Sequence, residues 1–242
     1  MPAETRKLAI VKAALPLFAR KGFAETTTKD LARAAQVSEP LLYKHFPSKE
    51  ALYFEIQTFS CQEFDPIIQR LNQLQPNTQT LVRLVYHLLR SLIVGGPAAN
   101  VEWETRHRLM LNSLMHDGAF ARIIYKNRFQ LYCRRIEKSL EVAIKAGEAV
   151  KGPVKIKNRA CFAHHIGAWL ALAHLPGAPA IEYRNTKDEL LNQSLWFALR
   201  GMGLTDNAIA RYYDPAALAR FFDETQSATH IASRARKRSP KA

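Results

Sequence analysis

The sequence predicts an all-α protein, and three observations support this fold class. Apolar residues recur at helical spacing along almost all of the 242 residues. The sequence has no alternating runs of Val, Ile and Thr and no Asn-Gly pair of the kind that forms hairpin turns. No unit of fixed length repeats along the chain, so the helices are not expected to stack as a solenoid.

The first helix is predicted over residues 5–21, where an apolar stripe lies at helical spacing. Gly22 is well placed as the left-handed residue that ends this helix. Pro16 lies inside the helix and removes one main-chain hydrogen bond, so we expect a kink there.

Two short helices follow, at residues 28–35 and 39–46, and a turn of three residues separates them. Thr27 and Asp30 have the spacing of a capping box at the first helix, and Ser38 is the N-cap of the second. Two helices of about two turns joined by three or four residues make a helix-turn-helix unit, which lays its second helix in the DNA major groove. This stretch therefore indicates a DNA-binding protein.

Helical patterns continue beyond this stretch. Ser48 is the N-cap of a fourth helix, and Asp65 and Pro66 mark a break in its pattern. The tail from residue 232 has no apolar pattern, and we expect it to be disordered. The predicted helices are 48–64, 66–74, 78–94, 101–115, 119–145, 158–174, 186–202, 205–212 and 215–225.

The chain is strongly basic, with 35 Lys and Arg residues against 21 Asp and Glu residues and a formal net charge of +14. A basic excess of this size favours polyanionic partners, which are nucleic acid or an anionic membrane surface. Charge alone does not separate these partners from the alternative of a generally basic cytosolic protein.

Cysteine usage and hydropathy predict the compartment. The three cysteines show no C-x-x-C pair, which indicates a reducing compartment rather than a disulfide framework or a zinc site. The longest apolar run, residues 166–175, is far shorter than the roughly 20 residues that span a bilayer. No segment has the full pattern of a signal peptide. We therefore expect a cytoplasmic protein with no membrane association.

The sequence shows no enzyme motif. It has no metal-binding pattern, no glycine-rich phosphate loop, no G-x-S-x-G and no obvious paired carboxylates. His164 and His165 are adjacent, so they face different sides of a helix and do not suit one metal ion. We expect no enzymatic activity, no metal and no cofactor. The alternatives are an all-α enzyme and a non-specific nucleic-acid-binding protein that uses the basic tail.

Residues 8–53 resemble the DNA-binding domain of the tetracycline-repressor (TetR) family of bacterial regulators. The matching patterns are AALPLFARKGF, TTTKDLARAA and VSEPLLYKHFPSKEAL, with family spacing from Gly22 to Tyr43, Phe46 and Lys49. Beyond residue 60 the resemblance is one of helix number and length. It implies a homodimeric transcriptional regulator, usually a repressor that a small-molecule effector releases from its operator.

The resemblance also implies a division of the chain. Residues 1–50 are expected to form a three-helix DNA-binding domain of the helix-turn-helix type. Residues 51–231 are expected to form a larger helical domain for effector binding and dimerisation. Residues 232–242 are expected to be a basic disordered tail.

Two positions depart from the family pattern. Gln36 stands in the turn where the family usually has glycine. If this residue adopts a positive φ, its side chain costs on the order of 1 kcal/mol of strain. Thr28 stands where the family often has an aliphatic residue. We expect the DNA preference of this chain to differ from that of its relatives at Gln36 and Glu39.

The candidate DNA contacts divide into phosphate contacts and base contacts. Thr27 and Thr28 lie at a helix N-terminus, where hydroxyl groups and free amides suit a phosphate. Glu39 can accept a hydrogen bond from a cytosine amino group. The alternative is that Leu41 and Tyr43 pack in the core and that Glu39 is a solvated charge. The expected DNA contacts are Thr27, Thr28, Lys29, Ser38, Glu39, Pro40, Leu41, Tyr43, Lys44, His45 and Lys49.

The resemblance implies one effector pocket in each subunit, among the helices of residues 78–145 and 158–174. Such pockets combine apolar and aromatic side chains with a few polar groups. The alternative is that the residues with this character are ordinary core or surface residues. The candidates are Trp103, Arg106, His107, Tyr125, Phe129, Tyr132, His165 and Trp169.

A dimer is also expected on physical grounds, because one short helix reads too few bases for useful specificity. Residues 158–174 carry small residues at every fourth position, which gives a smooth face for close helix approach. With residues 186–202, this helix would form a four-helix bundle across a two-fold axis. The alternative is an ordinary internal helix pair. The expected interface residues are Ala163, Gly167, Ala171, Leu191, Leu195, Ala198 and Met202.

Overall fold

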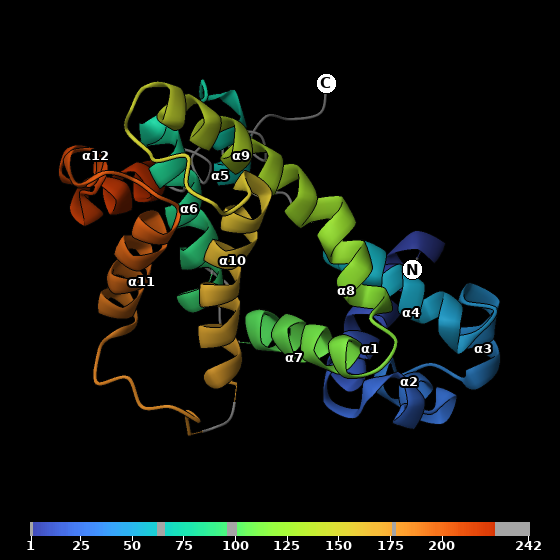
Figure 1. Ribbon diagram of the computed structural model, residues 1–242. Helices are drawn as coiled ribbons and strands as arrows, with labels where there is room; N and C mark the ends of the chain where they lie inside the picture. The colour runs from blue at the N-terminus through green and yellow to red at the C-terminus, as the bar shows by residue number, and fades with distance from the viewer. Residues whose placement is uncertain (1, 62–65, 96–100, 176–177, 226–242) are drawn as a thin grey trace. The chain divides into compact units, whose positions relative to one another are not determined.

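The protein is built from helices (Figure 1). The computed structural model describes residues 2–61, 66–95, 101–175 and 178–225. These residues contain no strand, and the pairing of Ala149 with Leu204 is an isolated β-bridge. The all-α prediction is confirmed. Over the same residues, no helix has both the length and the apolar character needed to cross a bilayer.

The chain divides into two compact units. The first unit comprises residues 1–63, 95–131 and 172–180, and the second comprises residues 64–94, 132–171 and 181–242. The first unit therefore holds the whole predicted DNA-binding domain together with later helices. The functional limits at residues 50 and 231 remain predictions. The predicted tail, residues 232–242, lies outside the described residues.

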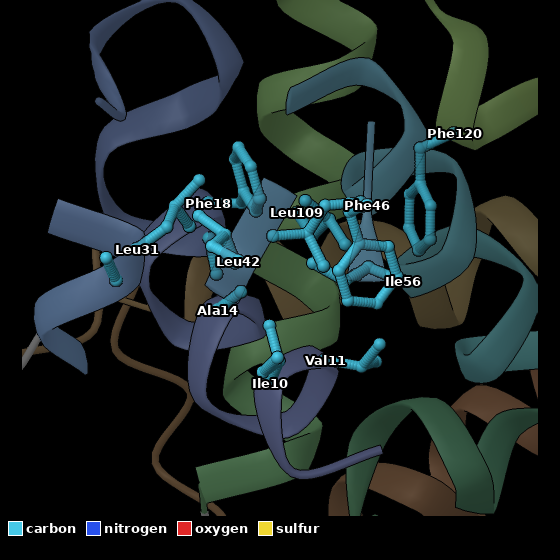
Figure 2. Packing of buried hydrophobic residues seen from close by; sticks show 13 residues of the cluster. Ile10, Val11, Ala14, Phe18, Leu31, Leu42, Phe46, Ile56, Leu109 and Phe120 are labelled. Carbon is cyan, nitrogen blue, oxygen red and sulfur yellow. The ribbon is translucent and has the colours of Figure 1, made fainter. Parts of the chain in front are cut away.

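The first unit encloses one apolar core, which Figure 2 shows from close by. Its helices are α1 (Ala3–Glu25), α2 (Thr28–Ala34), α3 (Glu39–His45), α4 (Lys49–Cys61), α7 (Val101–Met115), α8 (Ala119–Ile124) and the π-helical segment η1 (Tyr125–Phe129). Phe18, Leu31 and Ile56 are fully buried in this core. Leu109 of α7 and Phe120 of α8 belong to the same cluster. The two short DNA-binding helices therefore rest on a core that the rest of the unit shares.

The interruption in α1 lies at Gly22 and not at Pro16, where the kink was expected. Gly22 has φ 76° and ψ 176°, while the residues on either side stay helical. Glycine tolerates positive φ because it has no side chain. The hydroxyl of the buried Thr26 donates to the Gly22 carbonyl oxygen at 2.7 Å. This bond fixes the course of the chain between α1 and α2.

The second unit is centred on α6 (Thr78–Ile93). Leu81, Leu84 and Leu89 are fully buried, and α11 and α12 pack against this helix. Residues 215–225 are also helical. The other helices wholly or mostly in this unit are α5 (Pro66–Gln73), α9 (Gln130–Lys145), α10 (Ile156–Ala173), α11 (Lys187–Gly201) and α12 (Asp206–Tyr212).

The long helix predicted over residues 119–145 is continuous but not regular. It consists of α8, η1 and α9 in succession. In η1 the main-chain N–H of Gln130 donates to the carbonyl oxygen of Tyr125, five residues earlier. The apolar spacing along this stretch predicts a helix but does not reveal the extra residue in the π-helical turn.

Candidate nucleic-acid interface

The capping box at α2 is present as predicted. The main-chain N–H of Asp30 donates to the Thr27 hydroxyl at 3.1 Å, and the N–H of Thr27 donates to the Asp30 carboxylate at 3.4 Å. Lys21 donates to the same carboxylate at 3.0 Å. The bond from Lys21 and those from Thr27 hold the pKa of Asp30 below its ordinary value. The first turn of α2 is therefore held in place on both sides.

The helix α3 is fixed by a cap and by two buried side chains. The main-chain N–H of Leu41 donates to the Ser38 hydroxyl at 3.3 Å. Leu42 and Phe46 are buried in the core of the first unit. Because these two residues lie four apart, they occupy one face of the helix and leave the opposite face outside the core.

The opposite face of α3 is exposed. Pro40, Tyr43 and Lys44 lie on it, and 46% of the Tyr43 surface is exposed. The alternative in which Tyr43 packs in the core is therefore wrong, whereas Leu41 is half-buried. An exposed face with a ring, a hydroxyl and an ammonium group can meet both the sugars and the phosphates of a duplex.

The turn between α2 and α3 uses a left-handed residue that is not glycine. Gln36 has φ 54°, and it is the non-glycine residue with positive φ among those described. The N–H of Val37 donates to the Ala32 carbonyl oxygen at 3.0 Å, and the N–H of Gln36 donates to the Arg33 carbonyl oxygen at 3.1 Å. Gln36 thus meets the condition set for it from the sequence, and the turn carries the strain of a side chain at positive φ.

A hydrogen bond joins the first turns of α2 and α3. The Thr28 hydroxyl donates to the Glu39 carboxylate (Oε2) at 3.0 Å, and both residues are half-buried. Sequence reasoning assigned Thr28 to a phosphate and Glu39 to a base, and it did not foresee this bond. The two positions are eleven residues apart, so only the tertiary arrangement of α2 and α3 brings them together.

Lys49 has a structural role that the sequence did not reveal. Its ammonium group donates to the carbonyl oxygens of Phe23 at 2.9 Å and Thr26 at 3.1 Å. The same group lies 4.3 Å from the centroid of the Phe23 ring. Lys49 therefore ties the start of α4 to the end of α1, and its predicted phosphate contact remains a prediction.

The remaining predicted contacts lie on the same three helices. Thr28, Tyr43 and Lys49 surround one narrow gap among α2, α3 and α4, which has no room for a water molecule. The exposed members of the predicted set are Thr27, Lys29, Ser38, Pro40, Tyr43 and Lys44, and the half-buried members are Thr28, Glu39, Leu41, His45 and Lys49.

Comparison with known proteins agrees with this geometry. Residues 10–56 match the family model of bacterial regulatory proteins of the tetR family. These residues therefore form a DNA-binding domain of the TetR type. It is 47% identical over 47 residues to the uncharacterized HTH-type transcriptional regulator YerO of Bacillus subtilis, across 19% of this chain and 16% of YerO.

Two further relatives extend the comparison. The chain is 39% identical over 67 residues to the HTH-type transcriptional regulator EthR of Mycolicibacterium smegmatis, which is 28% of each protein. The sequence matches thus span less than a third of either curated relative. The crystal structure of AibR in complex with isovaleryl coenzyme A and operator DNA has a TM-score of 0.60 at 20% identity, over 79% of this chain and 97% of that one. At that identity, the likeness concerns the fold alone.

The candidate effector residues divide between the two units. Trp103, Arg106, His107, Tyr125 and Phe129 belong to the first unit, and Tyr132, His165 and Trp169 belong to the second. His165 and Trp169 are exposed, so they do not line the interior of their unit. The hydroxyl of Tyr132 donates to the Leu84 carbonyl oxygen at 2.5 Å, which ties it to α6. The predicted pocket remains a prediction.

Two candidates in α7 form a compact pair. The rings of Trp103 and His107 lie 4.2 Å apart between centroids. The Nδ1 atom of His107 is 2.8 Å from the Trp103 carbonyl oxygen, which requires the proton on that nitrogen. Burial lowers the pKa of His107 below its ordinary value.

The predicted dimer stripe requires a correction. A Cβ atom at Gly167 would lie 2.9 Å from Leu92 and 3.0 Å from Leu89, both side chains of α6 in the same chain. Gly167 therefore allows α10 to approach α6 of the same chain at this position. The seven residues predicted at the interface, all buried within the chain, are Ala163, Gly167, Ala171, Leu191, Leu195, Ala198 and Met202.

The other sides of α10 and α11 carry exposed aromatic residues that sequence reasoning did not assign to an interface. Trp169 is 61% exposed and Phe197 is 65% exposed, and Phe162 and Trp196 are also largely exposed. Phe162 and Trp169 are seven residues apart, which places them on one side of α10. An aromatic pair at helical spacing opposite a small-residue stripe is the sequence signal that would have found this face. We call these four residues the aromatic face.

Proposed function

We propose that this protein is a transcriptional regulator that binds duplex DNA of a particular sequence through α2 and α3. The observation that carries this proposal is that α3 has one buried face and one exposed face. Leu42 and Phe46 fix one face in the core, and the opposite face presents Pro40, Tyr43 and Lys44 to a partner. A helix anchored in this way can enter a major groove without distortion of the domain.

Charge and exposure support separate roles for the side chains. Lys29 and Lys44 are exposed on α2 and α3, where they can pair with phosphates on either side of a groove. Such contacts give affinity and register but carry no base sequence. Base recognition falls to the first turn of α3, where Glu39 and Pro40 come closest to the groove floor in the usual docking of this motif.

We further propose that the regulator is a homodimer joined through the aromatic face. Large aromatic side chains that stand exposed on neighbouring helices are typical of an interface, because a monomer gains nothing from their contact with water. An isologous contact of α10 and α11 would bury Phe162, Trp169, Trp196 and Phe197 against the same residues of a second copy. Two recognition helices then read two half-sites about 34 Å apart.

The proposed regulation is repression in the cytoplasm, relieved by a small molecule. AibR, which shares the fold, is named as a complex with isovaleryl coenzyme A and operator DNA. By analogy, an effector of this chain would bind one arrangement of the dimer better than the other. A shift of a few ångströms in the separation of the two recognition helices breaks the match to the half-sites, so operator affinity falls.

The test is in vitro selection of duplex DNA from a random pool, followed by gel-shift titration of the enriched sequence. The expected result is a two-fold symmetric motif whose affinity falls steeply with salt. Tyr43→Ala and Lys44→Ala should weaken binding to that motif, while a chain truncated after residue 231 should keep the same preferred sequence. A chain that enriches no sequence, or that loses its preference only on truncation, would instead be a non-specific nucleic-acid-binding protein.

A further inference from the structure

We propose that Thr28 is a positioning residue that holds the Glu39 carboxylate as a base-reading acceptor in the major groove. The inference deepens the proposed function and rests on it. Its basis is the hydrogen bond of 3.0 Å from the Thr28 hydroxyl to Oε2 of Glu39.

The bond joins two points that are each rigid. Thr28 is the first residue of α2 and follows the N-cap Thr27, and Glu39 is the first residue of α3 and follows the N-cap Ser38. Leu31, one turn further along α2, is fully buried in the core. A side chain on the first turn of a capped and packed helix has little freedom in its Cα and Cβ positions. The bond therefore fixes the orientation of the carboxylate itself.

The chemistry of the bond leaves Glu39 with a defined function. A carboxylate only accepts hydrogen bonds, and one of its two oxygens is taken by Thr28. The second oxygen can accept from an amino group at the edge of a base. In the major groove the amino groups belong to cytosine and adenine, and a carboxylate at this position pairs best with the cytosine N4 amino group.

The same geometry rejects guanine and thymine. Guanine presents two acceptors, N7 and O6, and thymine presents O4. A carboxylate that is held in place cannot turn away from these acceptors, so the wrong base meets a fixed negative charge. Specificity of this kind arises from repulsion as much as from attraction. An unanchored Glu39 would rotate toward water and discriminate less.

The hydroxyl of Thr28 is the donor of this bond. An aliphatic residue in place of Thr28 has no hydroxyl and cannot make this bond. The threonine therefore adds a donor to a site where packing alone would be satisfied by valine. Threonine and valine have nearly the same shape, so a Thr28→Val substitution tests the effect of removing the hydroxyl group.

The test compares base preference at each position of the selected operator for the full chain and three variants. Thr28→Val removes the hydroxyl, Thr28→Ser keeps it, and Glu39→Gln replaces the carboxylate with an amide that can also donate. We expect Glu39→Gln to reduce the preference for cytosine over thymine at one position in each half-site about tenfold, since a single base contact is lost. We expect Thr28→Val to reduce the preference at the same position about threefold to fivefold, and Thr28→Ser to restore it.

Three outcomes are distinguishable. A wild-type chain that selects no sequence overturns the proposed function, and this inference falls with it. A selective wild-type chain whose base profile is unchanged in Thr28→Val, with all duplexes weakened equally, makes Thr28 a phosphate contact and overturns the inference alone. A change in the profile at the position that Glu39→Gln also alters supports it. Thermal unfolding of each variant checks that the domain is folded. If Thr28→Val does not fold, the base profiles of Thr28→Ser and Glu39→Gln are compared with that of the full chain instead.

Discussion

The ammonium group of Lys49 donates a hydrogen bond of 2.9 Å to the carbonyl oxygen of Phe23 and lies 4.3 Å from the centroid of the same residue's ring. The Lys49 side chain thus supplies a hydrogen-bond donor to a carbonyl oxygen near the end of α1 and makes a cation–π contact with the Phe23 ring. Lys49 is the first residue of α4, and Phe23 lies in the last turn of α1. Their contact therefore fixes the positions of the two chain segments that flank α2 and α3.

Replacement of Lys49 by methionine should destabilise the N-terminal helices. The variant keeps the apolar stem but leaves the carbonyl oxygens of Phe23 and Thr26 without this donor and removes the cation from the ring. The expected loss is about 1–3 kcal/mol of unfolding free energy, measured by urea denaturation. If stability is unchanged and only DNA affinity falls, Lys49 acts as a phosphate contact and its carbonyl bonds contribute little.

Replacement of Gln36 by glycine should stabilise the turn between α2 and α3. Gln36 has φ 54°, where a side chain costs roughly 1–2 kcal/mol and glycine costs nothing, although glycine raises the entropy of the unfolded chain. The expected net gain is up to about 1 kcal/mol in the free energy of unfolding. Gln36→Ala is the matched control, because it keeps Cβ and therefore the strain. A stability of Gln36→Gly below that of Gln36→Ala would contradict this account.

The pH dependence of stability should include a contribution from His107. Burial lowers its pKa in the folded state, so the unfolded chain binds the proton more tightly. The resulting stability is fully present above the ordinary histidine pKa of about 6.5 and is lost as the pH falls below it toward the folded-state pKa. His107→Asn cannot titrate, and its unfolding free energy should therefore fall less between pH 7.5 and 5.5, values chosen to bracket the histidine pKa.

The chain offers a matched control for this measurement. His116 makes a similar bond, with its Nδ1 atom 2.7 Å from the Asn112 carbonyl oxygen, but it is exposed. His116→Asn serves as the control for the exchange of histidine for asparagine at an exposed position. Equal effects of the two substitutions would show that burial of His107 is not the cause.

Replacement of Phe197 by lysine should separate the proposed dimer into monomers. A pair of lysines brought to a two-fold interface meets apolar surface and like charge, and both oppose association. Light scattering at micromolar concentration should give the monomer mass, while circular dichroism shows the same helix content. Leu114→Lys is the control, since Leu114 is similarly exposed on α7 but lies outside the aromatic face. A monomeric parent protein would refute the dimer proposal.

Local chemistry made much of the DNA-binding unit predictable. The capping box of Thr27 and Asp30 and the cap at Ser38 depend on residues within three positions of one another, so their pattern can be read along the chain. Gln36 was singled out from the sequence as a position that would be strained at positive φ, and its φ is 54°. Helix caps and tight turns involve only residues that are close in sequence, so they can be predicted without knowing what packs around them.

Partners that are distant in sequence were decided by the tertiary structure. The spacing of Ala163, Gly167 and Ala171 identifies a smooth helix face, but a smooth face suits a helix of the same chain as well as one of a second chain. Gly167 lies against Leu89 and Leu92 of α6 in the same chain. Lys49 meets carbonyl oxygens 23 and 26 residues earlier, and Thr28 meets a carboxylate eleven residues later. The sequence by itself determined the helices, their caps and the strained turn, because these depend on neighbours along the chain. Only the tertiary structure decided which faces and side chains meet, because that depends on how the helices share a core.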